Sequence, residues 1–309
     1  MEILSNYQKF PDPAKGSVMA LGNFDGVHLG HQSVINFAKS ISRTKERPLS
    51  VMTFEPHPIT ILKEKVAPFR LTNPSQKERL IAQLGVDYLC IIPFGIDFAK
   101  ISAEDFVTEF LLNRFQVDHI VIGYDFIFGH NRKGDADLLK QMSSQYGFGF
   151  SQAEPIIYEE VNQPYSSTYI RQLLQVGAVQ EANSMLGHPF TIEGKIIKGK
   201  QLGRRIGYPT ANIKINDYIY PKFGVYAVNV KFHDRYFPGV ANIGIRPTFH
   251  RSHPLLEVHI FDFSHNMYGE YVEVELFKFL RPERMFNDAI ELKNQISADC
   301  QLARDVLWG

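Results

Sequence analysis

The pattern of apolar and polar residues changes near residue 186. Before it, short continuous apolar runs alternate with segments in which apolar residues recur at helical spacing. Such runs predict buried parallel strands separated by covering helices, and therefore a layered, doubly wound α/β domain. The predicted strands lie at residues 18–21, 49–54, 88–93 and 119–123. The predicted helices begin near residue 28 and continue to about 40, and lie at residues 75–84 and 103–115.

The second part of the chain shows a period of two residues. Apolar and polar positions alternate at residues 191–198, 224–232, 255–261 and 271–277, with Gly, Pro, Asn and Asp between these segments. This spacing predicts an antiparallel sandwich or barrel. A final helix is predicted at about 287–307, because one apolar stripe contains Leu292, Ile296, Cys300, Ala303 and Leu307. We therefore predict two domains, residues 1–186 and 187–309.

Composition excludes several classes of protein. The 309 residues contain 33 Lys and Arg against 33 Asp and Glu, so no net charge attracts nucleic acid or membrane surfaces. No run approaches 18 apolar residues, and the first residues lack an apolar signal core. Two cysteines are too few for a disulfide framework or a zinc site. We expect a reduced, cytoplasmic, soluble protein without nucleic-acid or membrane partners.

Residues 22–31, with the sequence GNFDGVHLGH, are the most informative segment. They join a predicted strand to a predicted helix, and glycine lets backbone N–H groups of the first helical turn approach an anion. His28 and His31 are three residues apart, so both rings would project from nearly the same side and donate to phosphate oxygens. The alternatives are an ordinary turn with two polar histidines, and a metal site that lacks a nearby third ligand.

Three further segments favour the phosphate interpretation. Residues 165–174 place hydroxyl groups at a helix start with Arg171 close behind, although ordinary capping beside a surface arginine explains them equally well. His57 and Asp125 each follow a predicted strand, at the edge where open α/β sheets bind ligands. A single His or Asp in such a loop is more often structural.

The second candidate site is the segment 199–212, GKQLGRRIGYPTAN. Its glycines and basic residues predict a flexible basic loop that is neither a P-loop nor a dinucleotide-binding fingerprint. Thr210 and Asn212 offer uncharged oxygen atoms to a magnesium ion that phosphates already hold. From the residues alone, a solvated glycine loop is the favoured interpretation.

The first half resembles the nucleotidylyltransferase half of the bacterial bifunctional riboflavin kinase/FAD synthetase family. The motif at 22–31 is complete, as are the Ser-Ser-Thr-x-x-Arg motif at 166–171 and the Thr-Phe-x-Pro-His-Pro loop at 53–58. Ile127 departs from the basic or polar residue that the family often carries there. The resemblance implies a Rossmann-like domain in which the phosphate of FMN attacks the α-phosphorus of ATP. The implied ATP-binding residues are Gly22, Phe24, His28, His31, Ser167, Thr168 and Arg171, and the implied flavin-binding residues are His57, Asp125, Phe126 and Phe128.

The second half resembles riboflavin kinases through residues 199–212, 224–226, 242–249, 256–263 and 280–283. The resemblance implies a small antiparallel β-barrel with a C-terminal helix, and it reverses the interpretation of the glycine loop. Glu257 is then the base that takes the proton of the ribityl hydroxyl, and Thr210 and Asn212 bind Mg²⁺ with ATP. The other implied residues are Gly199, Lys200, Gly207 and Pro209 for ATP, and Arg246 and Arg281 for the flavin.

Together the motifs predict an enzyme that phosphorylates riboflavin to FMN and then adenylylates FMN to FAD, releasing pyrophosphate. Its expected partners are riboflavin, FMN, ATP and Mg²⁺, and we expect a monomer or a weak homo-oligomer. One alternative is a kinase whose first domain transfers another nucleotide, such as a cytidylyl group. The other is a flavin-responsive regulator, which the intact set of candidate catalytic residues disfavours.

Overall fold

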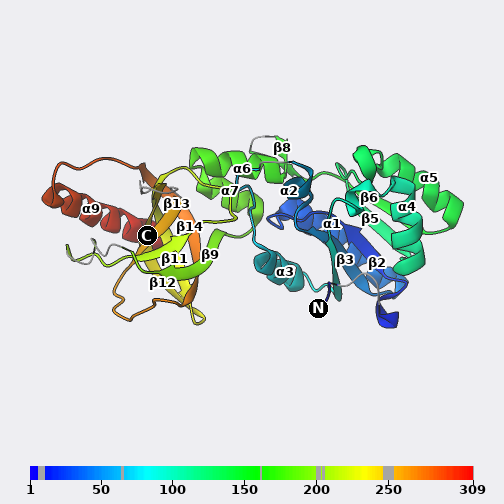
Figure 1. Cartoon of the computed structure of the whole chain (residues 1–309), viewed down its shortest axis with the longest axis horizontal. Coiled ribbons are helices and arrows are strands. Elements are labelled where there is room, and N and C mark those ends of the chain that lie inside the picture. Colours follow the sequence, from blue (N-terminus) through cyan, green and yellow to red (C-terminus); the bar gives the residue numbers. More distant parts are fainter. Residues whose placement is uncertain are drawn as a thin grey trace. The chain divides into compact units, whose positions relative to one another are not determined.

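The structure is a computed structural model that describes residues 1–5, 11–63, 66–160, 162–199, 203, 206–245 and 254–308. The chain folds into two compact units (Figure 1). The first unit contains residues 1–67 and 72–166. The second contains residues 68–71 and 167–309.

The first unit is built on a six-stranded parallel sheet with the order β1-β4-β3-β2-β5-β6. The central strands consist almost entirely of buried residues, as expected for a sheet covered on both faces. The strands are β1 (Glu2–Leu4), β2 (Val18–Leu21), β3 (Leu49–Glu55), β4 (Tyr88–Pro93), β5 (His119–Gly123) and β6 (Gly149–Ala153). The four strands predicted from the sequence are confirmed. β1 and β6 were not predicted.

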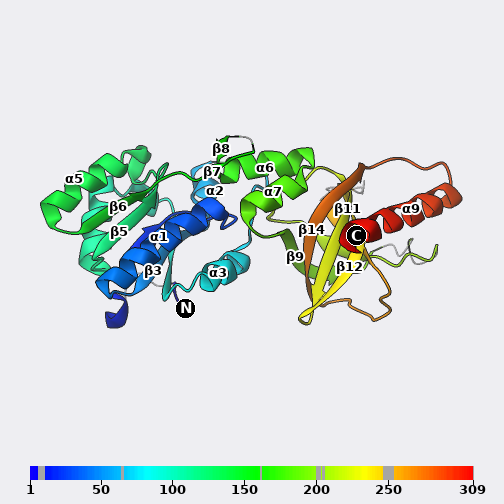
Figure 2. The same cartoon turned by 180° about the vertical axis from the view of Figure 1, so that it is seen from behind.

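Helices cover both faces of this sheet, so the doubly wound arrangement is confirmed. On the face that Figure 2 shows, α1 (Leu29–Lys45) and α3 (Pro74–Gln83) pack on one apolar cluster. On the other face, a second cluster lies under α5 (Ala136–Tyr146) and the helix that contains α4 (Ala103–Asp105) and η3 (Phe106–Arg114). The shorter elements are η1 (Asp12–Ala14), α2 (Pro58–Leu62), η2 (Phe98–Lys100), η4 (His130–Arg132), β7 (Ile157–Tyr158) and β8 (Gln163–Pro164).

The helix predicted at 103–115 is present, but most of it is not wound as an α-helix. It begins as an α-helix, but residues 106–114 form a π-helix, and the Phe115 N–H donates to the Phe110 carbonyl at 2.9 Å. Apolar spacing over so few residues is compatible with either winding, so the pattern could not distinguish them.

The strand order creates a switch point between β2 and β5. From β2 the chain adds β3 and β4 on one side, and β5 and β6 then lie on the other side. The loops after β3, β2 and β5 consequently leave from neighbouring strand ends at the carboxyl edge. Open α/β sheets bind ligands at such a point. This edge is where the sequence places residues 22–31, His57 and Asp125.

The second unit is a closed antiparallel barrel of six strands, in the order β10-β13-β12-β11-β14-β9 with β9 paired to β10. This confirms the barrel implied by the family resemblance and excludes an open sandwich. Its strands are β9 (Phe190–Ile197), β10 (Ala211–Lys214), β11 (Gly224–Phe232), β12 (Arg235–Ile245), β13 (Pro254–Ile260) and β14 (Tyr271–Pro282). The helices α6 (Ser167–Val176) and α7 (Val179–Leu186) precede the barrel.

Two of the six strands were not predicted. The segment 199–212 was expected to be a loop throughout, yet Ala211 and Asn212 begin β10, where Ala211 pairs with β13 and Asn212 pairs with both β13 and β9. β12 contains Pro238, Gly239 and Gly244, residue types that sequence patterns treat as strand breakers. Pairing on both sides within a closed barrel overrides these local preferences.

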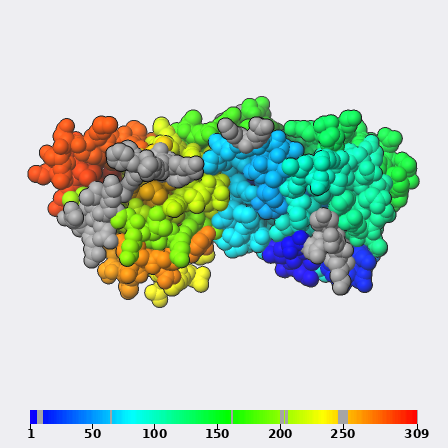
Figure 3. All heavy atoms as spheres, in the orientation of Figure 1, coloured from blue at the N-terminus to red at the C-terminus, as the bar shows by residue number. Residues whose placement is uncertain are grey.

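Helix α9 (Ala289–Trp308) confirms the predicted C-terminal helix and packs against the outer face of the barrel. Its residues Ile296, Cys300 and Ala303 lie over Val225 and Val240 in one apolar cluster. The segment before and at the beginning of α9 lies on the surface, as the orange-red atoms in Figure 3 show, and Met285 and Ile290 are 98% and 72% exposed.

The predicted domain boundary at residue 186 coincides with a change of secondary structure. α7 ends at Leu186, Gly187 caps it with a φ of +75°, and β9 begins at Phe190. The compact units divide earlier, between residues 166 and 167, because α6 and α7 pack with the barrel unit. The functional boundary at 186 stays a prediction.

Gly129 and Gly147 form a matched pair for testing the loop after β5. Gly129 has a φ of +72°, and a Cβ there would lie 2.6 Å from the Ala103 Cα. Gly147 has a φ of +78°, but no described heavy atom lies within 4 Å of a Cβ at that position. We expect Gly129→Ala to lower the free energy of unfolding of the first unit by about 3 kcal/mol, and Gly147→Ala by about 1 kcal/mol. Urea unfolding followed by circular dichroism measures both, and equal losses would contradict the packing assigned to Gly129.

Candidate functional sites

The turn between β2 and α1 positions two histidine rings. His28 is the N-cap of α1, and its Nδ1 accepts a hydrogen bond from the His31 N–H at 3.3 Å. This acceptor role places the proton of a neutral His28 on Nε2, which is then a donor. The rings of His28 and His31 stack with centroids 3.6 Å apart and planes at 21°. The sequence-based expectation that both rings lie on one side of the helix start is confirmed.

Two glycines of the motif are closely packed against ring side chains. A Cβ on Gly22 would lie 2.8 Å from the ring of Phe24, which is itself buried. A Cβ on Gly30 would lie 3.1 Å from the ring of His28. The glycines therefore leave room for the Phe24 and His28 rings at the start of α1.

A buried hydrogen-bond network holds the turn. The Thr72 N–H donates to Asp25 Oδ1 at 3.2 Å, and the Gly26 N–H donates to the Thr72 hydroxyl oxygen at 3.0 Å. Phe24, Gly26 and Val27 all have positive φ values, of 50°, 86° and 39°. Non-glycine residues seldom adopt this region, so the network with Thr72 stabilises an otherwise unfavourable backbone. Sequence analysis missed Thr72 because nothing in its local pattern indicates this long-range contact.

The remaining first-unit candidates lie after β3 and β5. His57 caps α2, where its Nδ1 accepts from the Ile59 N–H at 3.3 Å. Asp125 is exposed and Phe126 is half-buried. Phe128 is 7% exposed, stacks on Phe126 with centroids 5.8 Å apart, and belongs to the core cluster. The edge therefore offers one exposed carboxylate beside an aromatic pair.

Ser167, Thr168 and Arg171 belong to the second unit. α6 begins at Ser167, which confirms the helix start predicted there. Arg171 donates from Nε to the Phe69 carbonyl at 2.8 Å, and its guanidinium lies 5.4 Å from the Phe69 ring centroid. This contact fixes the direction of the guanidinium group. It also anchors the segment 68–71 to α6.

In the barrel, strand register brings candidate residues into one row. Asn212 on β10 lies opposite Glu257 on β13, which lies opposite Asn242 on β12. The neighbours Leu256 and Val258 are buried with 0% and 1% exposure, whereas Glu257 is half-buried. Glu257 therefore faces away from the apolar interior, as its alternation in the sequence predicts. The row combines one carboxylate with two amides.

The Asn212 side chain has the properties of a ligand for a hard cation. Its Oδ1 is buried and has no hydrogen-bond partner within the described ranges. A Cβ on Gly199 would lie 2.5 Å from the Asn212 amide nitrogen, so glycine there makes room for this amide. Neutral oxygens of this kind fit Mg²⁺ that is held mainly by phosphate groups. Among the described residues, no group of three His, Cys, Asp or Glu side chains could hold a metal by itself.

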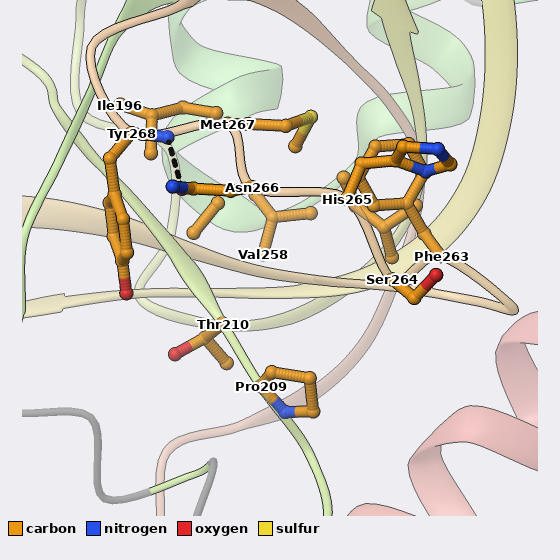
Figure 4. Close-up of a pocket in the computed structure, with 12 residues that line it drawn as sticks. Ile196, Pro209, Thr210, Val258, Phe263, Ser264, His265, Asn266, Met267 and Tyr268 are labelled. Carbon is orange, nitrogen blue, oxygen red and sulfur yellow. Dashed lines mark hydrogen bonds between the residues drawn. The ribbon is translucent and has the colours of Figure 1, made fainter.

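Thr210 lines a pocket with a volume of about 500 Å³ (Figure 4). Apolar side chains of the barrel form one part of its wall, and residues 263–268 form another. Tyr268 donates its N–H to Asn266 Oδ1 at 3.1 Å within this second wall. Sequence analysis did not assign residues 263–267 to a site. The lining residues are Ile196, Pro209, Thr210, Ala211, Val258, Ile260, Phe263, Ser264, His265, Asn266, Met267 and Tyr268.

His259 supports the backbone next to Thr210. Its Nδ1 lies 2.9 Å from the Pro209 carbonyl oxygen, and its ring meets the Tyr208 ring edge-on with centroids 5.3 Å apart. Burial lowers the pKa of His259, an effect that the hydrogen bond to Pro209 opposes. The neutral ring, with its proton on Nδ1, is then the donor to this carbonyl. Gly207 is exposed and has a φ of +94°.

Arg281 is held by the C-terminal helix. Its guanidinium donates to both carboxylate oxygens of Asp299, at 2.8 and 2.6 Å, and Asp299 is 4% exposed. Arg281 lies opposite Val225 in the register, so it continues the row that contains Asn242 and Glu257. Lys200 and Arg246, the other basic residues predicted for the site, lie outside the described residues.

Comparison with known proteins gives one result for each half. The family described as FAD synthetase matches residues 11–169, and the family described as riboflavin kinase matches residues 186–307. The chain is 40% identical over 294 residues to a bifunctional riboflavin kinase/FMN adenylyltransferase of Escherichia coli K12, covering 95% of this chain and 93% of that protein. It is 42% identical over 294 residues to the protein of the same description from Bacillus subtilis, covering 93% and 91%.

A solved structure, titled a macrolide-efflux protein from Streptococcus pneumoniae, is also similar. It shares 32% identity with a TM-score of 0.88, and the match covers 99% of each chain. This comparison shows a shared fold. Within the described ranges, no helix of the present chain has the length and apolar character needed to cross a membrane.

The lowered pKa of His259 predicts how stability depends on pH. A histidine whose pKa is lower in the folded state binds protons more readily when unfolded, so the barrel loses stability as the pH falls below about 6.5. We expect His259→Asn, which keeps a donor near the Pro209 carbonyl but does not titrate, to weaken this dependence. Thermal unfolding between pH 8 and pH 5 measures it, with the exposed His233→Asn as control. An unchanged dependence in His259→Asn would contradict the assignment.

Proposed function

The chain belongs to the family of bifunctional riboflavin kinase/FMN adenylyltransferases, and we propose that its two reactions use separate groups of residues. The protein is an enzyme that phosphorylates riboflavin to FMN with ATP and transfers an adenylyl group from ATP to FMN, which gives FAD and pyrophosphate. In the proposal, the residues of the β2–α1 turn serve the second reaction, and the row around Glu257 serves the first.

The stacked histidine pair carries the assignment of adenylyl transfer. The attacking FMN phosphate is already an anion, so the reaction needs positioning and neutralisation of charge rather than a strong base. His28 and His31 are at the N-terminus of α1, where the helix dipole and backbone N–H groups favour an anion. The two rings bind the ATP phosphates and stabilise the pyrophosphate that leaves. Gly22 and Phe24 shape the turn, and Ser167, Thr168 and Arg171 are further donors to ATP.

The flavin of FMN is assigned to residues at the same carboxyl edge of the parallel sheet. His57 follows β3 and Asp125 follows β5, the two strands that pair with β2. Phe126 offers an aromatic face that is half-buried. Phe128 supports Phe126 from the core. Ile127, which is 42% exposed, adds an apolar contact where the family often has a polar side chain.

The row around Glu257 carries the assignment of the kinase reaction. The ribityl hydroxyl is a poor nucleophile until a base removes its proton. Glu257 is the carboxylate of the row, and it lies in register with Asn212. Glu257 therefore takes the proton while the hydroxyl oxygen attacks the γ-phosphorus of ATP, whose bond to the β–γ bridging oxygen breaks as ADP leaves. Gly199, Lys200, Gly207 and Pro209 complete the ATP segment, and Arg246 and Arg281 bind the flavin.

Magnesium with ATP is part of this proposal. The buried Oδ1 of Asn212 and the hydroxyl of Thr210 are the protein oxygens that would hold it. When bound, the ion neutralises charge on the phosphates. A cytoplasmic location and a monomeric or weakly oligomeric state stay predictions.

Two substitutions separate the reactions. We expect His28→Ala to lower FAD formation about 10²–10³-fold, because a donor to the developing charge is lost. Glu257→Gln should lower FMN formation about 10²–10⁴-fold, because the amide cannot accept the proton. Each variant should retain the other activity. Incubation with riboflavin or FMN, ATP and Mg²⁺, followed by chromatographic separation of the flavins, measures both, and loss of both activities in either folded variant would refute the separate assignment.

Removal of magnesium tests the cation assignment. We expect EDTA to abolish FMN formation and added Mg²⁺ to restore it. Asn212→Leu should raise the Mg²⁺ concentration needed for half-maximal FMN formation, because one neutral oxygen ligand is removed. The Mg²⁺ dependence of FAD formation in the same variant is the internal control. An unchanged Mg²⁺ requirement for FMN formation would exclude Asn212 as a ligand.

A further inference from the structure

Lys77 is the only lysine or arginine that is buried in the described part of the chain. It lies on α3, and its side chain is 6% exposed. The ammonium nitrogen lies 3.2 Å from the Thr53 hydroxyl oxygen, 3.4 Å from the Asn23 carbonyl oxygen and 3.7 Å from Glu55 Oε2. All three oxygen atoms belong to the segments that follow β2 or end β3.

Burial of an ammonium group is unfavourable unless its charge is paired and its donors are satisfied. The helix that carries Lys77 does not need it, because Asn73 and Gln76 already form a complete capping box at its start. An apolar side chain of similar length would fill the same space without this cost. The local structure of α3 therefore does not explain the charge.

The contacts of Lys77 connect the β2–α1 turn of the adenylyl-transfer site to the end of β3. Asn23 belongs to the turn at 22–31, and Glu55 precedes His57 by two residues. The Thr53 hydroxyl also donates to the Asn23 carbonyl at 3.0 Å, so each of Lys77, Thr53 and Asn23 contacts the other two. Their relative position decides how far the histidine pair lies from the flavin loop after β3.

We propose that Lys77 is a positioning residue for adenylyl transfer, which holds the β2–α1 turn and the end of β3 in the relation that the reaction requires. This inference rests on the proposed function of that turn. Lys77 acts through the Asn23 carbonyl and the Thr53 hydroxyl, and the ammonium is held in place by Glu55. Loss of its charge would displace the turn and the end of β3 without removing any group that the proposal assigns to ATP or FMN.

The test compares Lys77→Met, Lys77→Arg and Thr53→Val with the wild-type chain. Lys77→Met keeps the length of the side chain and removes its charge, whereas Lys77→Arg keeps the charge. Thr53→Val removes the hydroxyl that joins Lys77 to Asn23 at nearly constant volume. Lys100→Met is the matched control, because Lys100 is 64% exposed and pairs with the exposed Asp97. Both activities are measured well below the unfolding midpoint of each variant.

We expect Lys77→Met to lower kcat for FAD formation about 10²-fold, as for a small displacement of reacting groups. Lys77→Arg should recover a large part of this loss, and Thr53→Val should lower kcat in the same direction. FMN formation by the barrel should stay at the wild-type rate in every variant, which shows that the loss is confined to the first unit. Lys100→Met should change neither activity.

Two results would overturn the inference. One is an unchanged rate of FAD formation in Lys77→Met. The other is a loss in Lys77→Met that Lys77→Arg does not recover and that Thr53→Val does not share. If Lys77→Met fails to fold, Lys77→Arg and Thr53→Val decide, and wild-type rates in Thr53→Val reject the proposal. A wild-type chain without FAD formation would instead refute the proposed function of the first unit.

Discussion

Backbone pairing between strands fixes the geometry on which both candidate sites depend. In the first unit, parallel pairing of β2 with β3 and β5 brings three carboxyl ends to one edge. In the second, antiparallel pairing aligns Asn212, Glu257 and Asn242 across three strands. A shift of one residue would turn Glu257 into the apolar interior and bring Leu256 or Val258 to the outer face. The placement of the reactive side chains in each site therefore depends on the register of the strands that carry or flank them.

The two units use different means to hold polar groups at these positions. In the first, side chains distant in sequence support a turn with an unfavourable backbone. The Asp25 carboxylate accepts from the Thr72 N–H, and Lys77 reaches the carbonyl of Asn23. In the barrel, the strands themselves place the residues. His259 then contacts the Pro209 carbonyl beside Thr210, and Asp299 accepts hydrogen bonds from Arg281. Attack on the α-phosphorus of ATP by a phosphate that is already charged depends chiefly on such positioning. Attack by an alcohol needs a carboxylate as well.

Elements with a strong pattern were predictable from the sequence. Continuous apolar runs gave β2, β3, β4 and β5, and two-residue alternation gave β9, β11, β13 and β14. β10 was missed because Asn212 and the glycine-rich segment before it have no alternation, and β12 because of Pro238 and Gly239. The π-helical winding at 106–114 was missed because it leaves the apolar spacing nearly unchanged. These failures occur where pairing or packing with distant residues outweighs local preference.

The sequence by itself determined which residue types are available: two histidines three residues apart between a strand and a helix, and a carboxylate that alternates with apolar residues on one strand. It also carried the motifs of both halves, because these depend on local spacing. Only the tertiary structure decided that the His28 and His31 rings stack and that Arg281 is bound by Asp299. It alone brought Lys77 between the β2–α1 turn and the end of β3, at residues 54 and 24 positions away in sequence. Contacts of this kind arise from strand order and burial, and no local pattern encodes them.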